Sequence, residues 1–169
     1  DPVLLSPDFR ARERLFSVLM QVSGRAGRGE IPGKVLLQTQ YTQDPLFHHL
    51  SRQNYSDFAT EELNSREKTR LPPFTAQALV IAEGKKINEV LKYLDEVKQA
   101  ALSLQYPGIH IYSPIPQSIM RIQDIERGQL LLEADSKKVM QEFLAVFSPI
   151  LFEKMNRFNV YIDVDPLNC

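Results

Sequence analysis

The succession of strand-like and helix-like segments in residues 72–169 constrains the fold of this chain most strongly. Apolar residues form short strand-like runs at residues 74–83, 109–112 and 129–133, and Val160, Ile162 and Val164 alternate with polar residues near the end. One helical pattern separates the first run from the second, and another separates the third from the last. The order β-α-β-β-α-β is typical of the ferredoxin-like fold, in which two helices cover one face of a four-stranded antiparallel sheet.

The two helices of this part have clear apolar faces. Ser136 is expected to cap the second helix, and Pro149 to restart or kink it. Between the second and third strands, we expect residues 114–127 to form a long loop. Apolar residues at helical spacing mark the first helix: Ile87, Val90, Leu91, Leu94, Val97, Ala101 and Leu104. Six aromatic residues are predicted to fill the core: Tyr106, Tyr112, Phe143, Phe147, Phe152 and Phe158.

A proline-rich stop, Leu71-Pro-Pro-Phe, divides the chain into residues 1–71 and residues 72–169. In the first part, residues 34–39 form a short apolar run typical of a buried strand. We expect this strand to be central in a larger sheet, so that it lacks neighbours in a chain of this length and exposes its backbone groups.

Three helices are predicted in residues 1–71. Ser6 and the proline after it are expected to open the first, and Gly24 or Gly27 to end it. Asp44 and the next proline open a short second helix. Ser56 is expected to cap the third helix, which runs towards residue 68 and carries many charged residues.

Composition narrows the classes of function. The 169 residues carry 20 Lys and Arg against 21 Asp and Glu, so the overall charge does not by itself predict a nucleic-acid binder. The single cysteine, Cys169, excludes a disulfide framework and a cysteine-based metal site. No apolar run approaches the roughly 20 residues of a membrane span. The chain begins at Asp1 without an initiator methionine, and we expect it to be a piece of a longer protein.

Two glycine-arginine pairs carry the strongest functional signal. Residues 21–28 read Gln-Val-Ser-Gly-Arg-Ala-Gly-Arg, so Arg25 and Arg28 lie three residues apart after an apolar helix. Near-helical geometry would place both guanidinium groups on one side, and the glycines let a phosphate group approach closely. Arginine stays charged and binds phosphate oxygens through two donors, and in phosphoryl transfer it stabilises the charge on the γ-phosphate.

This octet resembles motif VI of superfamily 2 helicases. Together with residues 6–15, the run at residues 34–39, the Leu71-Pro-Pro-Phe stop and the terminal Asp163-Val-Asp-Pro, it makes the whole chain similar to the C-terminal part of the bacterial primosomal replication-restart helicases. The resemblance implies an α/β chain. Residues 1–71 would be the tail of the second RecA-like lobe, and residues 72–169 a C-terminal ferredoxin-like (βαββαβ) α+β domain.

The resemblance also implies roles for individual residues. Arg25 and Arg28 would be catalytic and would contact the γ-phosphate of ATP. Gln21 would lie beside the nucleotide and couple it to DNA, and Gly24 would shape the turn as part of the ATP-binding site. Many members of the superfamily have arginine where this chain has Val22, so one contact of the motif is absent.

The function implied for the intact protein is ATP-driven 3′→5′ DNA unwinding for replication restart and primosome assembly in the bacterial cytoplasm. Its partners would be DNA forks, single-stranded DNA, primosome proteins and single-strand-binding protein. ATP and Mg²⁺ would be bound mainly by regions absent from this chain, because the sequence has no G-x-x-x-x-G-K-[ST] loop. Members of the family bind zinc through cysteines that would precede this segment. We therefore expect the chain alone to be inactive as an ATPase.

Other readings stay open. Arg121 and Arg127 fall on basic positions of a DNA-contacting hairpin in the family, but an ordinary solvated loop explains them equally well. Asp163 and Asp165 can mark a Mg²⁺ site, although a solvent-facing edge is the more frequent reason for such a pair. The three histidines lack zinc-site spacing, so no metal site is predicted in this chain. The alternative function is a non-enzymatic ferredoxin-like module that binds nucleic acid or protein.

Overall fold

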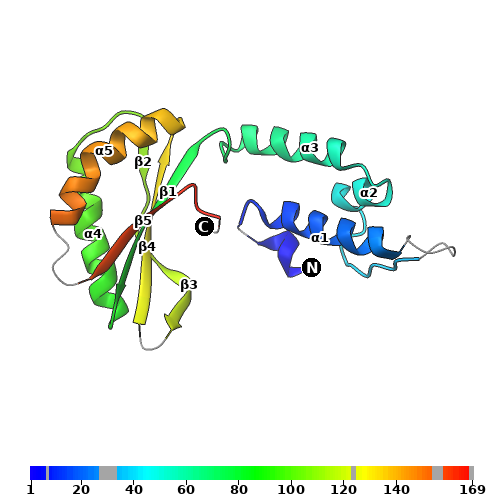
Figure 1. Ribbon diagram of the computed structural model, residues 1–169, viewed down its shortest axis with the longest axis horizontal. Coiled ribbons are helices and arrows are strands. Elements are labelled where there is room, and N and C mark those ends of the chain that lie inside the picture. Colours follow the sequence, from blue (N-terminus) through cyan, green and yellow to red (C-terminus); the bar gives the residue numbers. More distant parts are fainter. Residues whose placement is uncertain (7, 27–33, 123–124, 154–157, 168–169) are drawn as a thin grey trace. The chain divides into compact units, whose positions relative to one another are not determined.

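The computed structural model describes residues 1–6, 8–26, 34–122, 125–153 and 158–167 (Figure 1). The chain forms two compact units. The boundary along the chain falls between Thr69 and Arg70, close to the predicted boundary between Leu71 and Pro72. Each unit has a hydrophobic core of its own.

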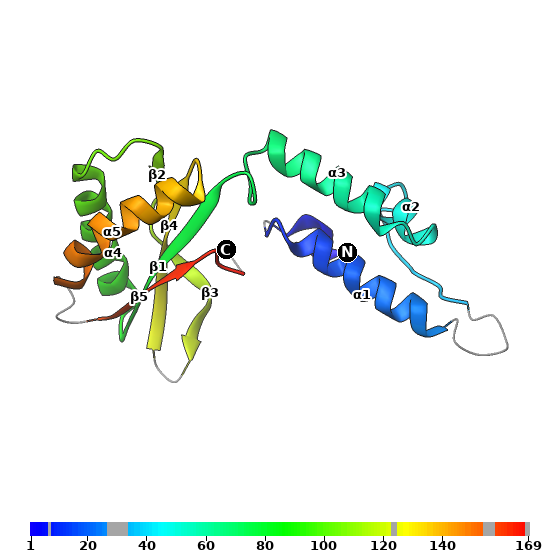
Figure 2. The same cartoon turned by 45° about the horizontal axis from the view of Figure 1, so that its top comes forward.

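Residues 70–167 form an antiparallel sheet and two helices. The elements are β1 (Ala76–Gly84), α4 (Ile87–Ser103), β2 (Ile109–Ile111), β3 (Ile115–Ile122), β4 (Ile125–Ala134), α5 (Lys137–Glu153) and β5 (Asn159–Val164). The strands lie in the order β2-β4-β1-β5, and β3 also pairs with β4. Figures 1 and 2 show α4 and α5 on the same side of this sheet. Without β3, this is the arrangement of a ferredoxin-like domain, so the predicted α+β fold class is confirmed.

The long loop predicted for residues 114–127 is wrong, because most of these residues belong to the β3–β4 hairpin. β3 pairs antiparallel with the first half of β4, and β2 pairs with the last residues of the same strand. The register of β3 shifts between Pro116 and Arg121. A proline and an irregular register at the edge of a sheet weaken the alternation by which a strand is recognised in a sequence.

The face of the sheet beneath α4 and α5 holds the core of this unit. β1 contributes small side chains to this face, and Ala78 and Ala82 are fully buried. The helices contribute large side chains, including Leu94 of α4 and Phe143 and Phe147 of α5. Small residues on the strand leave room for large residues on the helices, which is how a dense core is filled without voids.

Four of the six aromatic residues predicted for the core are in it or packed against it: Phe143, Phe147, Tyr106 and Phe158. The other two predictions are wrong, since Tyr112 is 39% exposed and Phe152 is 48% exposed. Phe152 lies at the end of α5, beside the buried Leu151. Tyr112 follows β2 on the face of the sheet opposite the helices, and side-chain size alone does not indicate which face a residue occupies.

Residues 1–69 form a helical unit with a much smaller core. Its elements are the short 3₁₀ helix η1 (Pro2–Leu5), α1 (Ala11–Ala26), α2 (Pro45–Ser51) and α3 (Tyr55–Lys68). Phe16, Leu46 and Phe58 form its buried centre, and the rings of Phe16 and Phe58 are stacked with their centroids 4.0 Å apart. So few buried side chains give a unit of this size little hydrophobic stabilisation.

The helix starts in this unit differ in part from the predictions. Asp44 caps α2 as predicted, because its side chain accepts a hydrogen bond from the backbone N–H of Leu46. Asn54 caps α3 in place of the predicted Ser56, and the helical residues of α1 begin at Ala11 instead of near Ser6. Several residues with capping side chains lie close together at both starts, and only the backbone geometry decides which of them accepts the bond.

The strand predicted at residues 34–39 is not formed. Val35, Leu36 and Leu37 are 42%, 85% and 41% exposed, and no strand pairs with them in the described part of the chain. A strand needs a neighbour to satisfy its backbone groups. The apolar side chains of this run are therefore exposed, although its sequence is typical of a strand buried in a sheet.

Candidate functional site

The described part of the Gly-Arg motif lies at the C-terminal end of α1. The helix continues through Gly24 to Ala26, so it does not end at Gly24 as one prediction allowed. Gln21, Gly24 and Arg25 are all exposed. Arg25 lies in the last turn of α1, where a positive charge also interacts favourably with the helix dipole. Arg28 and Gly27 lie outside the described residues.

One exposed stripe of α1 combines the motif with apolar side chains. At about 100° per residue, Val18, Gln21, Val22 and Arg25 fall within one sector of the helix surface about 100° wide. Val18 and Val22 are 56% and 50% exposed, although valine is a residue that protein interiors favour. The helix thus presents Gln21 and Arg25 within an apolar surface that the described residues leave uncovered.

Nothing in the described part of the chain packs against Gly24. A Cβ atom built on Gly24 would meet no described atom within 4 Å outside its neighbours and its own helix backbone. Gly24→Ala is therefore expected to stabilise α1, by up to about 1 kcal/mol, because alanine has the higher helix propensity. Thermal unfolding of the 169-residue chain followed by circular dichroism measures this effect. A clear loss of stability would show that Gly24 has a contact or conformation different from the one described.

Charged side chains join the N-terminal half of α1 to the other two helices. The Arg12 guanidinium donates two hydrogen bonds to Asp44, at 2.8 and 2.9 Å, and its Nε donates one to Glu62 of α3 at 2.8 Å. Arg66 of α3 donates to Glu13 of α1 at 2.9 Å. A guanidinium bound through several donors has a defined orientation. These contacts hold α1 in place and therefore orient the motif at its other end.

The Arg12–Asp44 pair predicts how the stability of this unit depends on pH. Hydrogen bonding by Arg12 lowers the pKa of the Asp44 carboxyl below its ordinary value, against the opposing effect of burial. A lowered pKa in the folded state stabilises the protein above the unfolded pKa, and the contribution is lost as the pH falls through the folded value. We therefore expect the helical unit to lose stability as the pH falls below about 4.

Asp44→Asn is the matched variant for this effect, because asparagine retains the helix-capping oxygen and loses the charge. The variant should unfold more easily at pH 7, and its unfolding free energy should depend less on pH between pH 5 and pH 2. Urea unfolding monitored at several pH values tests this prediction. Equal acid sensitivity of the two proteins would contradict it.

The two arginines predicted to contact DNA lie on the β3–β4 hairpin. Arg127 of β4 donates a hydrogen bond from its Nε to the Glu83 carboxylate on β1 at 2.6 Å, and Asn159 of β5 donates to the other oxygen of Glu83 at 2.9 Å. The hydrogen bond from Asn159 is the largest cause of the lowered pKa of Glu83, and Arg127 adds to it. Arg127 thus already has a partner within the sheet. Arg121 lies on β3 opposite Glu126.

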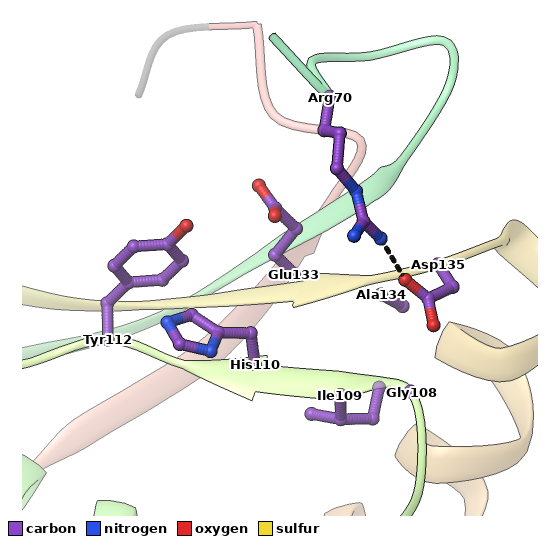
Figure 3. Close-up of a pocket in the computed structure, with 8 residues that line it drawn as sticks. All are labelled: Arg70, Gly108, Ile109, His110, Tyr112, Glu133, Ala134 and Asp135. Carbon is purple, nitrogen blue, oxygen red and sulfur yellow. Dashed lines mark hydrogen bonds and ion pairs between the residues drawn. The ribbon is translucent and has the colours of Figure 1, made fainter. Parts of the chain in front are cut away.

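A shallow groove that sequence reasoning missed lies at the β2 edge of the sheet. It has a volume of about 370 Å³, and His110, Tyr112 and Glu133 line it. Figure 3 shows these three side chains on one side of the sheet, with Arg70 reaching across to pair with Asp135. The alternation of residues along β4 indicates which of its side chains share a face, but it does not indicate that β2 lies beside them.

The structure gives no support to a metal site at the last strand. Asp163 is exposed on β5, whereas Asp165 lies beyond the strand with a φ of 54° and pairs with Lys137 at 2.9 Å. Among the described residues, no group of three or more His, Cys, Asp and Glu side chains is placed to hold a metal ion. None of the helices that the structure describes is long and apolar enough to cross a membrane.

The fold defines a class of protein in which a ferredoxin-like α+β domain follows a helical unit that carries an exposed Gln-and-Arg stripe. A family model described as "Primosomal protein N C-terminal domain" matches residues 67–167. The chain belongs to this primosomal protein N (PriA) family and corresponds to its C-terminal part.

Curated relatives support the assignment over nearly the whole chain. The chain is 37% identical to "Replication restart protein PriA" of Haemophilus influenzae, 36% identical to that of Synechocystis and 31% identical to that of Chlamydia pneumoniae. These alignments cover 98%, 99% and 99% of this chain, but only 23%, 20% and 22% of the respective relatives. The chain thus spans less than a quarter of their length.

Proposed function

We propose that this chain is the C-terminal part of an ATP-dependent 3′→5′ DNA helicase that restarts replication and assembles the primosome. The relatives are named for replication restart, and the octet at residues 21–28 has the pattern of helicase motif VI. Arg25 and Arg28 would stabilise the charge on the γ-phosphate of ATP during hydrolysis, and Gln21 would lie beside the nucleotide.

The exposed stripe on α1 is the observation that carries this proposal. Motif VI acts on a nucleotide held mainly by other parts of a helicase, so Gln21 and Arg25 must lie on a surface that can face those parts. The exposed Val18 and Val22 provide apolar surface beside them, and the apolar run at residues 34–39 is exposed as well, as expected where further parts of a RecA-like lobe would pack.

The partners and cofactors of the intact protein follow from the same proposal. ATP and Mg²⁺ would be held mainly by regions beyond these 169 residues, as would the zinc of the family. DNA forks and single-stranded DNA would be the substrates, acted on in the bacterial cytoplasm together with primosome proteins and single-strand-binding protein. In the ferredoxin-like domain, Arg121 and Arg127 on the hairpin remain the proposed contacts to DNA phosphates.

The ATPase activity of the purified 169-residue chain tests the central claim. An arginine that stabilises the γ-phosphate has nothing to act on without a phosphate-binding loop, so we expect no ATP hydrolysis above background with or without single-stranded DNA. DNA-stimulated hydrolysis by this chain alone would contradict the proposal.

The alternative function, a binding module without catalysis, differs in what the arginines do. A salt titration of single-stranded DNA binding separates the two. If the chain belongs to a helicase as proposed, Arg121→Ala and Arg127→Ala weaken binding and flatten the dependence on salt, whereas Arg25→Ala and Arg28→Ala change it little. If Arg25 and Arg28 grip nucleic-acid phosphate, their removal weakens binding instead.

A further inference from the structure

The face of the sheet opposite α4 and α5 is a second, distinct surface of the ferredoxin-like domain. Strand register places His110 opposite Glu133, and Leu79 of β1 opposite both Leu131 of β4 and Asp163 of β5. Residues paired in register share one face of the sheet. The residues that alternate with them along each strand face the helices and form the core. We call the following group the open-face patch: His110, Tyr112, Leu131, Glu133, Tyr161 and Asp163.

The patch offers apolar and aromatic contact area. Tyr112 and Tyr161 are 39% and 40% exposed, and the rings of His110 and Tyr112 meet edge to face with their centroids 4.6 Å apart. The groove lined by His110, Tyr112 and Glu133 opens on the same face (Figure 3). Half-exposed aromatic rings beside a groove are typical of surfaces at which proteins recognise other molecules.

The charge of the patch is acidic. Glu133 accepts a hydrogen bond from the neutral Gln77 at 3.2 Å, and neither Glu133 nor Asp163 makes an ion pair with a described residue. The two arginines near the patch are already paired, Arg127 with Glu83 and Arg70 with Asp135. Burial raises the pKa of the Tyr112 hydroxyl, and the nearby Glu133 raises it further.

This charge decides what the surface can bind. Exposed tyrosines on a sheet can stack on nucleic-acid bases, but a phosphate backbone would then lie against Glu133 and Asp163 and be repelled. Lysine and arginine side chains are attracted by both carboxylates and also bind favourably over tyrosine rings. Glu133 lies opposite Gln77 and Asp163 opposite Leu79, so the two residues are two strand spacings apart and offset by two residues along the strands, about 12 Å in all. An extended segment that crosses the sheet can meet both.

We propose that the open-face patch is a docking surface for a basic segment of a partner protein. Its lysine or arginine side chains lie against Glu133 and Asp163, and its apolar side chains pack on Tyr112, Leu131 and Tyr161. The proposal uses none of the arginines assigned to ATP or DNA, although Arg127 lies near the patch, so it stands whether or not the helicase proposal holds.

The pentapeptide Lys-Ser-Leu-Ser-Lys is the probe, because in an extended segment its two lysines and its leucine point to the same side. It is titrated into the isotope-labelled 169-residue chain and followed by NMR. We expect chemical-shift changes to concentrate at the open-face patch and to weaken as salt is added. The acidic peptide Glu-Ser-Leu-Ser-Glu should leave these signals unchanged. Changes concentrated on α4 and α5, or equal binding of the acidic peptide, would overturn the proposal.

Matched variants test the role of charge. Asp163→Asn should weaken binding of the lysine peptide about two- to fivefold, and Glu133→Gln by at least as much, because Glu133 is less exposed. Asp95→Asn on the exposed side of α4 removes the same charge away from the patch and should leave binding unchanged. Equal effects of Asp95→Asn and Asp163→Asn would show that only the overall charge matters. Binding of oligothymidylate at the patch in place of the peptide would identify a nucleic-acid surface and refute the proposal.

Discussion

Replacing Arg25 with alanine in the intact protein is expected to lower kcat for ATP hydrolysis by about 10³-fold or more. The guanidinium of an arginine finger stabilises charge that develops on the γ-phosphate only as the reaction proceeds, so kcat falls much more than the affinity for ATP. Arg25 is exposed and makes no contact on which the fold depends in the described residues, so the variant should remain folded. Steady-state ATPase assays with saturating single-stranded DNA measure the effect.

Two further variants sharpen this test. Arg28→Ala should have an effect of similar size, and the double variant should lose little more than either single variant, because the two side chains would act on one phosphate. Arg52→Ala, an exposed arginine that follows α2, is the matched control and should hydrolyse ATP normally. Affinity for single-stranded DNA should change less than about twofold in all of them. An Arg25→Ala protein with normal kcat would remove the basis of the helicase proposal.

Phe16→Ala is expected to unfold the helical unit while the ferredoxin-like unit remains folded. Phe16 is fully buried and stacked on Phe58, in a core whose third buried member is Leu46. Truncation of a buried phenylalanine costs about 3–5 kcal/mol. A unit of about 70 residues rarely has more stability than that. The loss should therefore remove most or all of the folding free energy of residues 1–69.

Hydrogen exchange resolved by residue measures this outcome. Protection should disappear from α1, α2 and α3 in the Phe16→Ala protein and persist in β1 and β4. Val18→Ala is the control on the same helix, and because Val18 is half exposed, it should change stability by less than about 0.5 kcal/mol. Joint loss of protection in both units would show that they fold as one cooperative body.

Local patterns in the sequence predicted most of the ferredoxin-like unit. Helical spacing of apolar residues placed α4, and alternation placed β5, because both elements bury one face against the same core. Local patterns missed the hairpin, which only the family resemblance implied, since β3 lies at an edge, contains a proline and has an irregular register. The open-face patch was missed for a different reason: its residues come from β2, β4 and β5, and no local pattern reports which strands are neighbours.

In residues 1–71, local patterns predicted one element that the structure does not form and helix starts at the wrong residues. The run at residues 34–39 has the composition of a buried strand, but a strand depends on hydrogen bonds to a neighbour that the described residues do not provide. Both Asn54 and Ser56 have side chains that can cap a helix. Backbone geometry, and not residue type, determined that Asn54 caps α3.

The amino-acid sequence by itself determined the class of the fold, the family and the identity of the arginines proposed to meet ATP, because periodicity and short motifs are local properties of a chain. The tertiary structure alone decided which side chains share a surface. Arg127 became the partner of Glu83, and Glu133 and Asp163 came to lie on one acidic face, because strand pairing joins residues that are far apart in the sequence.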